Sequence, residues 1–391
     1  MQTADKYVAV ENLGLIQRQA GTDPELADLV CACARLLSDE GRPWHFYDAT
    51  ATPTDPEDDF LCSWVGQKNP DVDPRVREFL QTYSRLLAVR RLPVLFSVGH
   101  LARKHKLSER HLHWIGWNAR RYYRKFTISK SGGGARTILA PEGKLLTLQR
   151  WILRHILDRR QPHRRAFAFV KGRSILDNVR GHIGRKVVVR LDLKDFFPSI
   201  THACVRKVFQ GFGYPYRVAV MLTNLCTVDG RLPQGAPTSP ALSNLVFQRT
   251  DRRFEGLAKK MKFRYSRYAD DLIFSSNKAN LPCLIPFFKQ ILREDGYEVN
   301  EGKVRVMRQG QRQEATGVVL NEKANLRREH VRRLRAAVHR LHTHGPEHVQ
   351  LASRRPGEHD LQFVLQGHLS FLRMINHGQG DALLNVIPPR H

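Results

Sequence analysis

Two adjacent aspartates interrupt an otherwise apolar segment of the chain. Asp270 and Asp271 lie in SRYADDLIFSS, residues 266–276, where the other residues are typical of a β-strand and interior aspartates are uncommon. A third aspartate, Asp192, lies near the end of the β-branched run KVVVRLDL, residues 186–193. If the two segments are neighbours in one sheet, three carboxylates converge and repel one another unless cations compensate their charge.

The chemistry that such a cluster supports is phosphoryl transfer with divalent metal ions. Mg²⁺ prefers oxygen ligands and binds a few carboxylates together with substrate phosphates. Two Mg²⁺ ions about 3.5–4 Å apart would activate an attacking hydroxyl and stabilise the leaving oxygen. A turn cap or a salt bridge is the alternative for one aspartate, but three in this pattern favour metal binding.

The segments that must position these carboxylates are strands flanked by helices. The apolar run at residues 186–193 predicts a buried central strand, and residues 262–276 predict a hairpin with the aspartate pair at its tip. Residues 124–141 predict another hairpin with a glycine-rich tip at 131–134, and residues 144–160 predict an amphipathic helix.

Two further helical patterns flank these segments. Residues 97–117 predict two short helices joined at residues 106–108; the pair resembles a helix-turn-helix, although two packed helices without a role in DNA binding are commoner. Residues 325–342 predict a helix with an apolar stripe and six arginines on the remainder, which favours a track for phosphates. The stripe consists of Val331, Leu334, Val338 and Leu341.

The chain is strongly basic, and its charge is unevenly distributed. Its 391 residues include 64 Lys and Arg and 37 Asp and Glu, a net charge of +27. Residues 1–75 contain 6 basic and 14 acidic residues, a net charge of −8, so the remaining 316 residues carry +35. Because such a field attracts polyanions, we expect the protein to bind nucleic acid rather than merely to have a soluble basic surface.

The same sequence argues against the membrane, secretory, zinc-binding and disulfide-rich classes. No apolar run approaches the roughly 18 residues that span a bilayer, and the first residues lack a secretory signal, so we expect no membrane contact. The six cysteines are scattered, without CxxC or paired histidine spacing. This pattern suits a reducing cytoplasm.

Three segments around the aspartates resemble the motifs of reverse transcriptases, in the same order and spacing. They are LDLKDFFPSI at residues 191–200, LPQGAPTSPALSNLVF at 232–247 and RYADDLIF at 267–274. VNEGKVRVMR, residues 299–308, resembles the lysine-bearing motif that follows them, and ATGVVLN, residues 315–321, resembles the turn before the thumb. The resemblance spans about residues 95–375 and is greatest to bacterial retron-type enzymes.

This resemblance implies an α+β, right-hand polymerase fold with fingers, palm and thumb. Residues 1–90 would form an acidic, mostly helical N-terminal extension, and residues 91–185 the fingers with an RNA-contacting segment. Residues 186–312 would form the palm, an antiparallel sheet plus helices that carries the catalytic aspartates. Residues 313–391 would form the turn into a short helical thumb and the thumb itself.

The resemblance also implies roles for individual residues. Asp192, Asp270 and Asp271 match the catalytic aspartates that bind two Mg²⁺ ions. Phe197 matches the aromatic residue that excludes a 2′-hydroxyl and so selects deoxynucleotides, although FFPSI is apolar throughout and a core phenylalanine is the alternative. The other nucleotide-binding residues that the family implies are Gln234, Arg136, Lys130 and, beside the leaving pyrophosphate, Lys303.

Two shorter elements match retron enzymes in particular. Asn178 and His182 have the spacing of an Asn-Ala-x-x-His element, with valine in place of alanine. Thr316 and Gly317 match a Val-Thr-Gly element in which alanine here replaces valine. In the family these elements help to bind a structured noncoding RNA, whereas residue type alone leaves open a helix cap at Asn178 and a surface histidine at His182.

The function implied by the resemblance is RNA-directed DNA synthesis by a retron. Such an enzyme uses dNTPs and a cognate structured noncoding RNA, as template and primer, to make RNA-linked, multicopy single-stranded DNA. Retrons generally act in antiphage defence with an effector protein. The alternatives are another bacterial reverse transcriptase, either diversity-generating or an untemplated defence polymerase, and a catalytically silent RNA-binding scaffold, against which Phe197, Gln234 and the aspartates argue.

Overall fold

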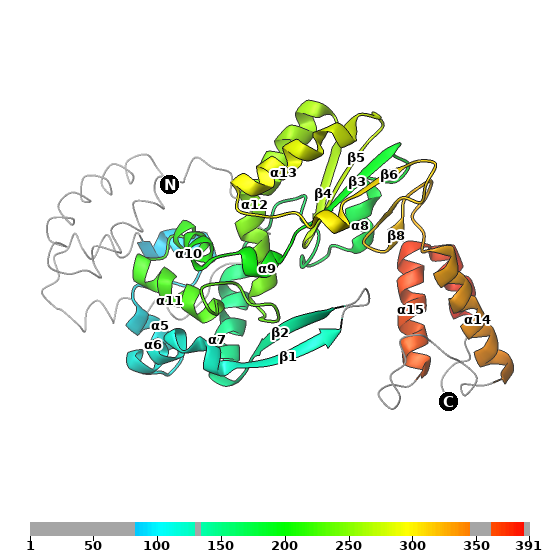
Figure 1. The fold of residues 1–391 in the computed structure, drawn as a ribbon. Helices are drawn as coiled ribbons and strands as arrows, with labels where there is room; N and C mark the ends of the chain where they lie inside the picture. Colours follow the sequence, from blue (N-terminus) through cyan, green and yellow to red (C-terminus); the bar gives the residue numbers. More distant parts are fainter. Residues whose placement is uncertain (1–82, 130–133, 345–360, 387–391) are drawn as a thin grey trace, which may run out of the picture. The chain divides into compact units, whose positions relative to one another are not determined.

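The computed structural model describes residues 83–129, 134–344 and 361–386, and these fall into two compact units (Figure 1). Of these residues, the first unit comprises those from 83 to 162 together with 195–248, and the second comprises 163–194 together with those from 249 to 386. This division differs from the expected domain ranges, because residues 195–248 group with the predicted fingers and residues 163–185 group with the sheet.

The described part of the first unit is helical, with one hairpin. Its helices are α5 (Val98–Lys104), α6 (Glu109–Trp117), η2 (Ala119–Tyr122), α7 (Gly143–Ile152), the π-helical turn η3 (Leu153–Leu157), α9 (Phe196–Ser199), α10 (His202–Gly211), α11 (Tyr216–Cys226) and the start of α12 (Ser239–Met261). Its hairpin pairs β1 (Tyr123–Ser129) with β2 (Ala135–Pro141), and the tip at residues 130–133 lies outside the described residues.

The two short helices expected over residues 97–117 are confirmed as α5 and α6. Serine hydroxyls cap both: Ser97 Oγ accepts a hydrogen bond from the His100 amide, and Ser108 Oγ accepts one from the His111 amide. Between them Lys106 adopts a left-handed conformation with φ of 54°, which ends α5 and redirects the chain.

The second unit is built on a four-stranded antiparallel sheet in the order β4-β5-β3-β6 (Figure 1). Its strands are β3 (Val187–Asp192), β4 (Arg264–Tyr268), β5 (Asp271–Ser276) and β6 (Arg305–Arg308). β3 lies inside the sheet and is almost completely buried, which confirms the predicted central strand, and β4 and β5 confirm the predicted hairpin.

Neighbouring residues of β5 pack into two separate hydrophobic cores, because successive side chains of a strand point to opposite faces of the sheet. Phe274 stacks on Phe288 of α13 (Ile285–Glu294) and contacts Phe254 of α12, so these helices cover one face. Ile273 joins the cluster that contains Val179 of α8 (Ile175–Arg180) and the C-terminal helices on the other face.

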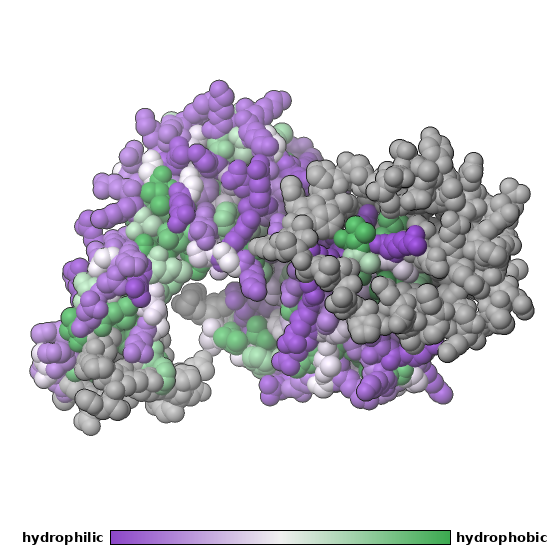
Figure 2. Space-filling view, turned by 180° about the vertical axis from the view of Figure 1, so that it is seen from behind, coloured by the Kyte–Doolittle hydropathy of each residue, from purple (hydrophilic) through white to green (hydrophobic). Residues whose placement is uncertain are grey.

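The described residues at the C-terminal end of the second unit form a short hairpin and three helices. They are β7 (Glu314–Ala315), β8 (Val318–Val319), α14 (Arg328–His344), α15 (Leu361–Ile375) and α16 (His377–Leu384). The predicted stripe on α14 is confirmed, since Val331, Leu334 and Val338 are buried. On the face of the molecule in Figure 2, hydrophilic residues cover most of the described surface.

No helix among the described residues is long and apolar enough to cross a membrane.

Candidate active site

The register of the sheet brings the three predicted aspartates to one end of the hairpin. Asp192 and Asp271 are direct partners across β3 and β5, the last pair of that ladder. Asp270 lies in the turn between β4 and β5, and its carbonyl oxygen accepts a hydrogen bond of 3.0 Å from the Leu193 amide. The expected juxtaposition therefore follows from strand pairing alone.

Burial favours the protonated form of the Asp271 carboxyl group. Its pKa is raised to about 6, mainly because burial disfavours the charged form, and the charges of Asp270 and Asp192 raise it further. Arg190 and Lys303 act in the opposite direction. The Arg190 Nε lies 3.2 Å from Asp271 Oδ1, yet the two atoms are not aligned as a hydrogen bond.

Lys303 contacts the other carboxylate of the pair. Its Nζ lies 3.0 and 2.9 Å from the two oxygens of Asp192. The short helix η5 (Glu301–Lys303) places it there, and the Asn300 amide donates to the Asp192 carbonyl over 2.8 Å. Sequence reasoning placed Lys303 beside a nucleotide and did not anticipate this ion pair.

The side chains of the site are of the type that binds a divalent metal ion, but they are not arranged around a common point. In the part of the chain that the structure describes, no group of three or more His, Cys, Asp and Glu side chains is arranged to hold a metal ion. Asp271 Oδ1 is nevertheless buried without a hydrogen bond, and Mg²⁺ prefers such carboxylate oxygens. Asp192, Asp270 and Asp271 would hold the ion, and Lys303 would have to yield or share Asp192.

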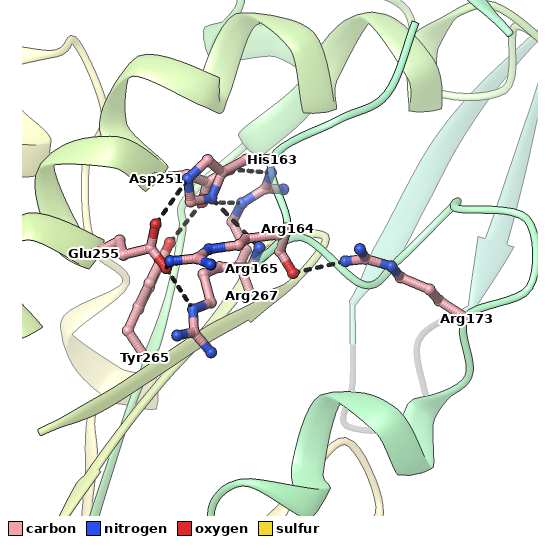
Figure 3. A network of polar contacts seen from close by, with 8 residues as sticks. All are labelled: His163, Arg164, Arg165, Arg173, Asp251, Glu255, Tyr265 and Arg267. Atoms are coloured by element: carbon pink, nitrogen blue, oxygen red, sulfur yellow. Dashed lines mark hydrogen bonds and ion pairs between the residues drawn. The ribbon is translucent and has the colours of Figure 1, made fainter. Parts of the chain in front are cut away.

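A buried ion pair supports the turn that carries the aspartates (Figure 3). Arg267 on β4 and Asp251 on α12 are both fully buried and joined by two hydrogen bonds of 3.0 and 2.8 Å. The Tyr265 hydroxyl donates to the same carboxylate over 2.7 Å. Arg267 also donates over 3.1 Å to the carbonyl of Ala269, the left-handed residue (φ 56°) directly before Asp270.

The segment after residue 162 joins the free edge of β4. The Arg267 amide donates to the Arg165 carbonyl over 2.8 Å, and the Phe167 amide donates to the Arg267 carbonyl over 2.9 Å. Figure 3 shows the guanidinium groups of Arg164 and Arg165 directed at Glu255 of α12, with hydrogen bonds of 2.8 and 2.9 Å. Part of the basic region near the predicted RNA elements therefore holds the sheet edge to α12.

The remaining nucleotide-pocket residues that the structure describes lie in the first unit. Gln234 is tied to the hairpin, because its carbonyl accepts a 2.8 Å hydrogen bond from the Leu139 amide. Arg136 is exposed on β2, and Lys130 lies outside the described residues. Of the two phenylalanines of FFPSI, Phe196 is the buried one, whereas Phe197 is only half-buried.

Asn178 and His182, predicted to contact RNA, are both buried, with only 1% of each exposed. Ser174 caps α8, so Asn178 is not a helix cap, and His182 is not a surface residue. The His182 ring lies between two hydroxyls, with Nδ1 2.7 Å from Ser275 Oγ and Nε2 2.9 Å from Ser266 Oγ. Burial lowers the pKa of His182 to about 3, so the ring is neutral at ordinary pH.

Thr316 and Gly317 form the two-residue turn between β7 and β8. Both have positive φ, 48° and 81°, as a tight turn of this kind requires. Such a conformation is strained for a β-branched residue like threonine, whose hydroxyl is buried without a hydrogen-bond partner. Gly317 is exposed.

Comparison with known proteins gives a family match over the same residues. Residues 128–330 match the family described as "Reverse transcriptase (RNA-dependent DNA polymerase)". The chain is 38% identical to the retron Mx65 reverse transcriptase and 35% identical to the retron Mx162 reverse transcriptase, both of Myxococcus xanthus. These alignments cover 69% and 75% of this chain and 65% and 67% of the relatives.

A shorter relative is matched over almost its whole length. The chain is 34% identical to the retron Ec86 reverse transcriptase of Escherichia coli, over 76% of this chain and 90% of that protein.

Proposed function

Because the chain belongs to the retron-type reverse transcriptases, a family of RNA-directed DNA polymerases, we propose that it copies part of a cognate structured noncoding RNA into DNA. The RNA serves as template and primer, and the product is single-stranded DNA that stays linked to it. The observation that carries the proposal is the pairing of Asp192 with Asp271 across β3 and β5, with Asp270 in the adjoining turn. A scaffold that only binds RNA has no need of three aspartates in this position.

In the proposed reaction each part of the site has a separate task. Mg²⁺ bound by the aspartates would activate the attacking hydroxyl and stabilise charge on the transferred phosphate. Lys303, with an ammonium group already among the carboxylates, would donate a proton or a hydrogen bond to the leaving pyrophosphate. Phe197 would exclude ribonucleotides by contact with the sugar, while Gln234 and Arg136 would bind the base and the triphosphate of the dNTP.

The biological setting follows the retron relatives. We propose that the DNA is the multicopy product of a retron and that the system acts in antiphage defence with an effector protein. The support is the named identity of the relatives, together with the net charge of +27, which suits a protein that stays bound to RNA and DNA.

The test is dNTP incorporation with Mg²⁺ on the RNA that co-purifies with the full chain. The wild type should extend this RNA, and the Asp270→Ala/Asp271→Ala variant should not. Asp229→Asn is the matched control, since Asp229 is an exposed aspartate of the first unit. If the wild type extends nothing on its own RNA, the proposal is wrong. If it extends any primer–template equally well, the claim that it copies a cognate RNA is wrong.

A further inference from the structure

Helix α6 exposes two tryptophans on one face. Trp114 is 51% exposed and Trp117 is 72% exposed, and residues three positions apart lie side by side on a helix. The helix meets the rest of the first unit through other residues, namely the buried Leu112, Ile115 and Gly116. Tryptophan is mostly buried in folded proteins, so two exposed on one short helix indicate a surface that binds something.

The tryptophans line two adjoining hollows. One, of about 440 Å³, is lined by Arg110, His111, His113, Trp114 and Trp117. The other, of about 250 Å³, also contacts His113 and Trp117 and extends to Tyr216 and Arg217 of α11. Trp117 therefore forms a wall common to both hollows, and a flat group could lie on either side of it.

Arginine side chains accompany these aromatic rings. The Arg121 guanidinium lies over the Trp114 ring at 5.5 Å, and Arg206 lies over the Tyr216 ring at 5.1 Å. Of the acidic side chains nearby, Asp229 forms an ion pair with Arg120, and Glu109 lies 3.6 Å from His113. The surface is thus aromatic and positively charged, which suits a ligand with both flat rings and negative charges.

We propose that this surface of α6 and α11 binds an unpaired stretch of RNA, with bases stacked on Trp114 and Trp117 and phosphates held by Arg110 and Arg121. Bases stack on aromatic side chains whatever their sequence, and arginine binds phosphate through its planar fork. RNA is the occupant because, in the proposed function on which this inference rests, the protein binds its RNA before any DNA has been made. The exposed tryptophans would suit a protein partner equally well, but the arginines stacked beside them favour a ligand with negative charges.

Binding of an unpaired oligouridine of about 16 nucleotides to the full chain tests the proposal, without dNTPs or Mg²⁺. Trp114→Ala and Trp117→Ala should each weaken binding by about 5- to 150-fold, and Trp117→Phe should retain most of it, because a phenyl ring still stacks. Phe287→Ala, which removes an exposed ring from α13, is the matched control and should bind as the wild type does.

Salt dependence separates stacking from phosphate contact. Arg121→Gln should reduce the slope of log affinity against log salt by about 0.7, whereas the tryptophan variants should keep the wild-type slope. Unchanged affinity for RNA in both tryptophan variants would overturn the proposal, even if those variants lost a bound protein. A preference of this surface for unpaired DNA over unpaired RNA would overturn it as well. Since the assay involves no synthesis, its result stands whether or not the protein proves to be a polymerase.

Discussion

The Nζ atom of Lys303 lies within hydrogen-bond distance of both carboxylate oxygens of Asp192, at 3.0 and 2.9 Å. A lysine cation therefore already contacts one of the carboxylates that would hold a metal ion. Lys303→Met should lower the half-saturating Mg²⁺ concentration for dNTP incorporation by about two- to fivefold, because an exposed ion pair contributes little. The maximal rate should fall as well, since the leaving pyrophosphate loses a cation.

The measurement is the initial rate of incorporation as a function of Mg²⁺. Lys289→Met is the control, because Lys289 forms an ion pair with Glu301 rather than with an aspartate of the site. An unchanged or increased Mg²⁺ requirement in Lys303→Met would show that lysine and metal do not compete.

Asp271→Asn should stabilise the protein while abolishing incorporation. In the folded state the pKa of Asp271 is raised from 3.8 to about 6, so the wild type loses stability as pH rises from about 4 to about 6. The amide carries no charge, and without Mg²⁺ at neutral pH the free energy of unfolding should rise by about 1–3 kcal/mol. Urea unfolding with and without Mg²⁺ tests this.

Added Mg²⁺ should stabilise the wild type and leave Asp271→Asn nearly unchanged, because only a ligand that binds the folded state raises stability. A variant less stable than the wild type in metal-free buffer would contradict the expected benefit of removing a charge from a buried site.

The buried pair of Arg267 and Asp251 should matter more for the position of the turn than for net stability. Arg267→Met alone leaves a buried carboxylate without its partner and should cost about 3–5 kcal/mol. The triple variant Arg267→Met/Asp251→Leu/Tyr265→Phe removes the buried guanidinium, carboxylate and hydroxyl that contact one another, and it should recover most of that loss. Incorporation should not recover, because the hydrogen bond to the Ala269 carbonyl is absent.

Chemical denaturation and incorporation rates, measured on the same preparations, separate the two effects. Recovery of full activity in the stable triple variant would show that the Ala269 contact does not position Asp270.

The strands could be predicted because hydrophobic pattern is local, and the meeting of the aspartates then required only that β3 and β5, about 80 residues apart in the chain, be neighbours in one sheet. Alternation in β5 and the apolar run of β3 determine which residues face the cores, and one register then brings Asp192 opposite Asp271. Asp251 gave no such signal. A single aspartate within a helix suggests a solvated face, and only the packing of α12 on the sheet reveals its buried arginine partner.

The burial of polar residues could not be predicted from the sequence either. Asn178 and His182 occur in a basic, polar stretch, so pattern alone placed them on the surface or against RNA. Their burial depends on Ser266 and Ser275, which come more than 80 residues later, and on how α8 packs against β4 and β5. The signal that was available is the alternation in SRYADDLIFSS, which directs small hydroxyl residues to the covered faces of both strands.

Gly235→Ala should damage nucleotide binding in the first unit. Gly235 has φ of 120°, and a Cβ there would lie 2.7 Å from both the Leu139 carbonyl oxygen and Ile138 Cγ2. The turn would have to leave the β2 strand, which would break the hydrogen bond between Leu139 and Gln234. We expect the KM for dNTPs to rise by about tenfold or more, equivalent to about 1.4 kcal/mol.

Gly230→Ala is a matched control for this prediction. Gly230 also has positive φ, 71°, but a Cβ there would meet nothing within 4 Å. It therefore carries the backbone strain of an alanine at positive φ without the collision. Equal effects of the two substitutions on KM would mean that strain alone, and not the contact with β2, explains the loss.

His182→Gln should change the pH dependence of stability. The folded-state pKa is about 3, against 6.5 ordinarily, so the neutral ring stabilises the fold fully above pH 6.5 and this stabilisation is lost as pH falls toward 3. Within that window one such histidine contributes a slope of about 1.4 kcal/mol per pH unit, which the variant should lack. Urea unfolding at about pH 7.5, above this window, and between about pH 6 and 4, within it, measures the slope.

His339→Gln, at an exposed position of α14, is the control and should keep the wild-type slope. Because His182 holds Ser266 of β4 and Ser275 of β5, the variant should also lose activity equally on cognate RNA and on a generic primer–template. The opposite pattern, an unchanged slope with loss confined to the cognate RNA, would make His182 an RNA contact after all. Burial of the ring favours the first result, since a side chain 1% exposed reaches RNA only through the strands it supports.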